Sequence, residues 1–92
     1  MTAVNTRKLI LNDGTIIEGG DAGLSSNGNL WLWFEGYTMM QAFTMFLDPE
    51  KTARITFWRT EEAEDTYEGY TNCTNINIDA LGTMHVCMTR EG

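Results

Sequence analysis

The sequence predicts an α+β fold: a curled antiparallel sheet, or a small barrel, of about six strands with one helix packed on it. Three observations support this. The chain has 92 residues, enough for one core and one domain spanning residues 1–92. Short aliphatic and aromatic runs separated by Gly, Asn and Asp recur along it, which is typical of strands. Only residues 38–47 show a helical period, so the expected order is β-β-β-α-β-β-β.

The first two strands are expected to form a hairpin, after a flexible tail of residues 1–6. Residues 8–12 and 15–18 flank the dipeptide Asp13-Gly14. Asp-Gly between aliphatic residues predicts a type I′ turn, which needs positive φ at both central positions. Residues 19–29 are rich in Gly, Ser and Asn, and this composition predicts a loop.

Residues 29–34 predict a short, buried strand, since five of the six are large and apolar. A run this apolar is typical of a strand covered on both faces. Strand alternation places Leu30 and Leu32 on one face and Trp31 and Trp33 on the other.

The helix over residues 38–47 is expected to start at Thr38, with Gln41 completing a capping box. Asp48-Pro49 ends it, because the residue before proline avoids the α region. The apolar stripe predicted to face the sheet is Met39, Ala42, Phe43, Phe46 and Leu47.

Three further strands are expected after the helix. Residues 53–59 alternate, with Ile55 and Phe57 buried and Trp58 on the opposite face. Residues 61–65 read as an exposed acidic linker, because adjacent carboxylates repel one another.

The last two strands, residues 66–79 and 83–89, are expected to form a hairpin. A bulge is expected near Gly69, and Gly82 suits the left-handed position of a type I turn with a bulge. The inner face of this hairpin is predicted to carry Ile76, Ile78, Met84, Val86 and Met88.

A five-residue pattern occurs twice: Phe34-Glu35-Gly36-Tyr37-Thr38 and Tyr67-Glu68-Gly69-Tyr70-Thr71. We interpret it as one type of β-bend used twice. A duplicated half-domain is the alternative.

Charge excludes several classes of function. Thirteen acids against six bases give a net charge of −7, which argues against direct binding to nucleic acid or to an anionic membrane. No run approaches the roughly 20 apolar residues of a membrane span, and the polar start is unlike a signal peptide. A cytosolic setting follows, in which Cys73 and Cys87 are reduced, although a bridge between them is sterically conceivable.

The sequence shows no catalytic residues, metal site or cofactor motif, so we expect a protein that is not an enzyme. His85 is the single histidine, and Cys87 lies about 7 Å along the same strand face, too far for a direct hydrogen bond. The cysteine spacing matches no zinc site, and the acidic run lacks the glycine of a calcium loop. Residues 19–23 are glycine-rich but lack a following lysine.

Two sets of residues are candidates for binding a partner. Trp31, Trp33 and Trp58 would form an aromatic patch if one sheet face were left open, although the far side of a closed barrel would bury them. Presented together, carboxylates would mimic the phosphates that a nucleic-acid-binding partner recognises. The acidic candidates are Glu61, Glu62, Glu64 and Asp65.

The segments Leu11-Asn12-Asp13-Gly14-Thr15, Asn29-Leu30-Trp31-Leu32-Trp33 and Tyr67-Glu68-Gly69-Tyr70-Thr71 carry a resemblance. Over most of its length the chain resembles small uncharacterised proteins encoded by phages and prophages of gut Firmicutes. The resemblance implies a protein of the host cytoplasm or of the virion, without known catalytic residues.

We therefore expect a non-enzymatic interaction or assembly module whose partner is a second copy, forming a homo-oligomer, or a phage or host protein. The alternative is a small acidic inhibitor of a host nucleic-acid-handling defence protein, similar to an anti-CRISPR protein.

Overall fold

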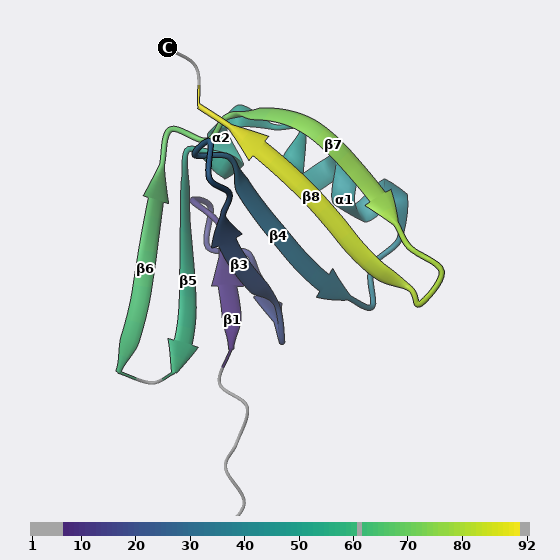
Figure 1. The fold of residues 1–92 in the computed structure, drawn as a ribbon, viewed down its shortest axis with the longest axis horizontal. Helices are drawn as coiled ribbons and strands as arrows, with labels where there is room; N and C mark the ends of the chain where they lie inside the picture. The colour runs from purple at the N-terminus through teal and green to yellow at the C-terminus, as the bar shows by residue number, and fades with distance from the viewer. Residues whose placement is uncertain (1–6, 61, 91–92) are drawn as a thin grey trace, which may run out of the picture.

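The computed structural model describes residues 7–60 and 62–90. This part of the chain holds eight strands and two short helices (Figure 1). In chain order they are β1 (Lys8–Ile10), β2 (Ile16–Glu18), β3 (Asp21–Leu24), β4 (Leu30–Glu35), α1 (Met39–Phe46), α2 (Pro49–Thr52), β5 (Arg54–Thr60), β6 (Ala63–Glu68), β7 (Asn72–Ile78) and β8 (Thr83–Thr89).

The strands form two four-stranded antiparallel sheets. The first sheet has the order β2-β1-β5-β6, and the second has the order β3-β4-β8-β7. Successive hairpins alternate between the two sheets. The β1–β5 pair joins the two hairpins of the first sheet, and the β4–β8 pair joins the two hairpins of the second. The α+β class with antiparallel pairing is confirmed. The single six-stranded sheet or barrel is wrong, because the chain changes sheets after each hairpin.

The two sheets and α1 share one hydrophobic core. Phe34 of β4 packs against Phe46 of α1, with ring centroids 5.5 Å apart. Figure 1 shows α1 behind β7 and β8. The buried core includes Leu9, Ile17, Ile55 and Phe57 of the first sheet, Leu30, Leu32, Phe34, Met84, Val86 and Met88 of the second sheet, and Ala42, Met45 and Phe46 of α1.

The β1–β2, β3–β4 and β7–β8 hairpin turns each have one glycine with positive φ. Gly14, Gly28 and Gly82 have φ of 90°, 85° and 85°, and each donates its amide to the carbonyl three residues earlier. This confirms the bulged turn predicted at Gly82. The type I′ turn predicted at Asp13-Gly14 is wrong, because Asp13 keeps negative φ while its Oδ1 accepts the Thr15 amide at 3.0 Å.

The loop predicted for residues 19–29 is also wrong, because residues 21–24 form β3 and pair with β4. Two of its four glycines lie against a side chain, while Gly19 and Gly28 have positive φ. A Cβ on Gly20 would lie 2.9 Å from Cδ1 of Leu9, and Gly23 lies beneath the Trp33 indole. The glycines of this segment thus include both positive-φ positions and a tight contact at Gly20, and the sequence alone does not distinguish the two.

The helix signals are confirmed at both ends of α1. Thr38 Oγ1 accepts the Gln41 amide at 3.2 Å, and Gln41 Oε1 accepts the Thr38 amide at 2.8 Å. The helix ends before Asp48-Pro49 as predicted, but Pro49 then begins α2, with Asp48 Oδ1 accepting the Glu50 amide at 3.0 Å.

The long strand predicted for residues 66–79 is wrong. Residues 63–68 form β6 in the first sheet, and residues 72–78 form β7 in the second. The chain leaves β6 at Gly69, with φ of 83°, and crosses between the sheets instead of forming a bulge there. The register shift lies further on, between Cys73 and Asn75. The predicted acidic linker is therefore partly strand, while Glu61 and the tail of residues 1–6 lie outside the described residues.

The repeated five-residue pattern forms the same bend twice. Gly36 has φ of 86°, close to the 83° of Gly69. In each bend the aromatic residue before Glu-Gly meets the following tyrosine edge-on, at 5.3 Å in the first and 6.2 Å in the second. One bend follows an interior strand and the other an edge strand, so the repeat is local.

Candidate functional site

The three tryptophans do not form one patch. Trp31 and Trp33 lie on the outer face of the second sheet, while Trp58 lies on the outer face of the first sheet, with Lys8 Nζ 4.7 Å from its ring centroid. All three are half-buried. The single aromatic patch predicted from the sequence is wrong, because β4 and β5 belong to different sheets and their outer faces point away from a shared core.

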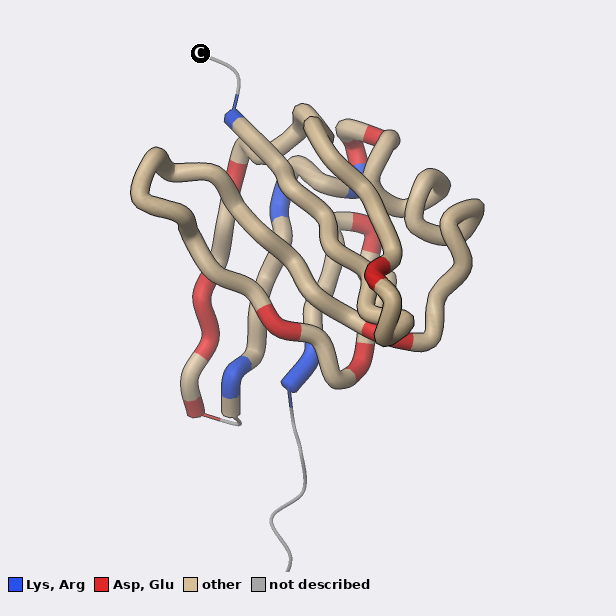
Figure 2. The backbone as a smooth tube through the Cα atoms, turned by 45° about the vertical axis from the view of Figure 1, so that its right-hand side comes forward, with Lys and Arg blue, Asp and Glu red and all other residues tan. Residues whose placement is uncertain are grey.

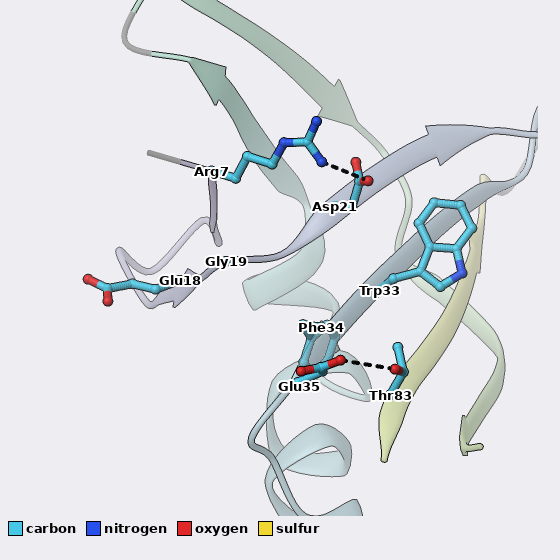
Figure 3. Close-up of a pocket in the computed structure, with 8 residues that line it drawn as sticks. All are labelled: Arg7, Glu18, Gly19, Asp21, Trp33, Phe34, Glu35 and Thr83. Atoms are coloured by element: carbon cyan, nitrogen blue, oxygen red, sulfur yellow. Dashed lines mark hydrogen bonds and ion pairs between the residues drawn. The ribbon is translucent and has the colours of Figure 1, made fainter. Parts of the chain in front are cut away.

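A shallow cavity of about 370 Å³ opens where β2 and β3 meet the end of β4 (Figure 3). Its charged groups are already paired or point apart. Arg7 Nη1 contacts Asp21 Oδ2 at 3.1 Å, and Thr83 Oγ1 donates to Glu35 Oε1 at 3.3 Å. In Figure 3, Glu18 points away from the other carboxylates. The cavity therefore does not converge its charges on one ligand position.

His85 pairs with a carboxylate that organises the β7–β8 turn. His85 Nε2 donates to Asp79 Oδ2 at 2.7 Å, while Asp79 Oδ1 accepts the amides of Leu81 and Thr83. The hydrogen bond from His85, followed by that from the Thr83 amide, lowers the pKa of Asp79. The carboxylate of Asp79 thus ties the turn to the strand that follows it.

The two cysteines are free thiols. Cys87 is buried on β8, opposite Trp31. Cys73 is half-buried, and burial raises the pKa of its thiol above the ordinary value. The raised pKa of Cys73 is opposite to the lowered pKa that an activated nucleophile needs. Among the residues from 7 to 60 and 62 to 90, no group of three or more His, Cys, Asp or Glu side chains could hold a metal ion.

The acidic candidates differ in their surroundings. Glu62 and Glu64 are exposed, and Glu64 pairs across from Trp58 in the sheet register. Asp65 Oδ2 lies 3.1 Å from Arg59 Nε, so its charge is partly neutralised. The structure therefore presents two of the four predicted carboxylates openly, while Glu61 lies outside the described part.

Charge is distributed unevenly along the strands (Figure 2). Among the described residues, the strand directions put seven acids and three bases at the end of the molecule that includes the β5–β6 and β7–β8 turns. The other end has four acids and three bases among the described residues. Residues 36–47, which include all of α1, contain no charged side chain. The helix is thus an uncharged element in a strongly acidic protein.

Large apolar side chains lie on the outward side of α1 and on its C-cap residue, beside the exposed polar residues Gln41 and Thr44. Met40, Phe43 and Leu47 are 75%, 40% and 57% exposed, and we call these three residues the α1 ridge. Beside it lies an open groove of about 300 Å³ lined by Tyr37, Met40, Gln41, Thr44 and Met45, which we call the α1 groove.

The α1 ridge was missed in the sequence because Phe43 and Leu47 were assigned to the buried stripe. The residues that α1 buries are Ala42, Met45 and Phe46, so the buried face is rotated from the predicted one. The available signal was the number of apolar residues, since seven of the nine residues from 39 to 47 are apolar. One helix face does not bury that many.

In the described part of the chain, no helix is both long enough and apolar enough to cross a membrane. Comparison with protein-family models, with curated proteins and with solved structures finds no match for this chain.

Proposed function

We propose that the protein is a non-enzymatic interaction module that binds another protein chain through the α1 ridge and the α1 groove. The observation that carries this proposal is the exposure of three large apolar side chains on α1 and its C-cap residue, a segment without charged residues. Contiguous apolar patches on soluble proteins mark interaction sites more often than isolated apolar residues do.

The arrangement suits recognition by a helical or apolar segment. Met40, Phe43 and Leu47 follow the i, i+3, i+7 spacing of anchors that enter a partner's groove. The neighbouring groove accepts a side chain in return, and its methionines adapt to the shape of what enters. The resemblance to phage proteins supports a role in the assembly of a virion or of a regulatory complex inside a bacterium.

The proposal is tested by photo-crosslinking in a bacterium that expresses the protein. A photoreactive phenylalanine analogue replaces Phe43, and the same analogue at Leu24 serves as the control. Leu24 is 54% exposed on β3, away from α1, so it reports random encounters. Discrete covalent adducts at position 43 and none at position 24 are expected.

The mass of the adduct identifies the partner class. An adduct of twice 10.4 kDa is a dimer of this chain, and another mass is a different protein. The proposed function fails if position 43 gives no more adduct than position 24.

Inhibition of a nucleic-acid-binding defence protein is the second candidate, and the concentration of acids at one end favours it over an evenly charged surface. Its test is the activity of a purified RNA-guided nuclease with and without this protein. Wild-type protein should inhibit, and a Glu62→Gln, Glu64→Gln variant should inhibit more weakly. Undiminished nuclease activity at excess wild-type protein removes this candidate.

A further inference from the structure

We infer that the partner of α1 is a second copy of this chain, and that two copies pack their α1 helices antiparallel about a two-fold axis, each α1 ridge filling the α1 groove of the other. The inference rests on the proposed function, because it names the occupant of the same surface.

Charge is the first argument for a second copy. Each chain carries −7, so most orientations of two copies bring acids together. Residues 36–47 have no charged side chain, and the ammonium of Lys51 lies 3.3 Å from the Thr44 carbonyl. α1 is therefore a surface where two copies bring few acids together. A basic partner would gain more electrostatic attraction at the acidic end, where Glu62 of the β5–β6 turn and Glu64 of β6 are exposed.

Shape is the second argument. At about 100° per residue, Phe43 and Leu47 lie on one side of Met40, while Gln41 and Met45 lie on the other. The ridge and the groove are thus parallel and adjacent on the same helix. A two-fold axis places the ridge of each copy against the groove of the other. The surface is then complementary to itself, as an isologous interface requires.

The fit defines a register. Phe43 enters the middle of the groove when it faces Thr44 of the second copy. In an antiparallel pair this alignment also sets Met40 opposite Leu47 of the second copy. Both ends of the ridge are then covered, since Met40 and Leu47 are its two most exposed members.

The size of the surface sets the expected strength. An eight-residue helix is about 12 Å long. A standard interface takes roughly 800 Å² from each partner, about one-seventh of the 5734 Å² of accessible surface here, and α1 alone offers less. We therefore expect a reversible dimer with a dissociation constant between about 10 µM and 1 mM.

Sedimentation equilibrium of the full chain over about 1 µM to 1 mM is the test. The expected result is a mass that rises from 10.4 kDa toward twice that value, and more readily at higher salt, because salt screens the repulsion between two acidic chains. A mass that stays at 10.4 kDa throughout overturns the inference, as does dissociation by salt.

Matched variants locate the interface. Leu47→Glu should weaken the dimer at least about tenfold, because it buries a carboxylate in an apolar contact. Leu24→Glu, at nearly equal exposure on β3, should leave the dissociation constant within about twofold. Equal effects of the two variants overturn the inference.

A double variant tests the antiparallel register. Met40→Lys alone should weaken the dimer, but Met40→Lys with Leu47→Glu should restore it. In the proposed register the lysine introduced at position 40 faces the glutamate introduced at position 47 of the second copy, whereas within one helix the two are seven residues apart and do not meet. A double variant weaker than both single variants overturns the register.

Failure of the inference is distinguishable from failure of the proposed function. A monomer in sedimentation, combined with an adduct at position 43 of a mass other than a dimer, removes the second copy as the partner and leaves the interaction module in place. A monomer without any adduct at position 43 removes both.

Discussion

Two phenylalanines three residues apart in α1 should respond very differently to truncation. Phe46 is fully buried and packs on Phe34, whereas Phe43 is 40% exposed. Phe46→Ala removes a buried ring and leaves a cavity, which costs about 3–5 kcal/mol. Full burial of a phenylalanine side chain stabilises by up to about 3 kcal/mol, and Phe43→Ala loses roughly 60% of that because Phe43 is 40% exposed. Alanine regains about 0.5 kcal/mol through its higher helix propensity, so the net cost is about 1 kcal/mol.

Urea unfolding followed by tryptophan fluorescence measures the difference. With a slope of about 1 kcal/mol per molar, Phe46→Ala should lower the midpoint by about 3 M or more, and Phe43→Ala by about 1 M. If Phe46→Ala does not fold, Phe46→Leu should cost about 1–1.5 kcal/mol and Phe43→Leu less. Equal losses for the two positions would show that both rings are in the core and would refute the assigned helix face.

Two other predictions test contacts between strands. Gly20→Ala should destabilise by about 1–3 kcal/mol, because its Cβ would meet Leu9 Cδ1 at 2.9 Å, while Gly23→Ala, with its nearest contact at 3.6 Å, should change thermal stability little. The lowered pKa of Asp79 means that its hydrogen bond to His85 stabilises the fold above the unfolded-state pKa near 3.8, and that this stability is lost as pH falls through the lower folded-state pKa. Urea midpoints between about pH 5 and pH 3 should therefore fall more steeply for the wild type than for Asp79→Asn, and parallel curves would contradict the assignment.

Local signals in the sequence were sufficient where the cause of the structure is local. The capping box of Thr38 and Gln41 and the glycine of the last turn depend on residues within four positions, and both are confirmed. The alternation that buries Ile55 and Phe57 is also confirmed.

Long-range features were not available from the sequence. Gly23 lies in a strand, where a Cβ would come within 3.6 Å of the Trp33 ring of the neighbouring strand, and this contact depends on the strand pairing. Ile78 was predicted on the inner face of the last hairpin but is 41% exposed near the end of an edge strand. The candidate patch of tryptophans failed for the same reason, since the assignment of Trp33 and Trp58 to different sheets depends on where the chain crosses between them.

The helix α1 shows how an excess of apolar residues indicates a surface for binding. A helix that packs on one side needs an apolar stripe of about three residues in seven. Residues 39–47 have seven apolar residues in nine, and the core takes Ala42, Met45 and Phe46 fully. Of the other four, Met39 packs against the core, while Met40, Phe43 and Leu47 face outward on a chain with a net charge of −7. The apolar side chains on the outward face of α1 contribute less to the fold than the buried ones, and this is why we assign them to contact with a second chain.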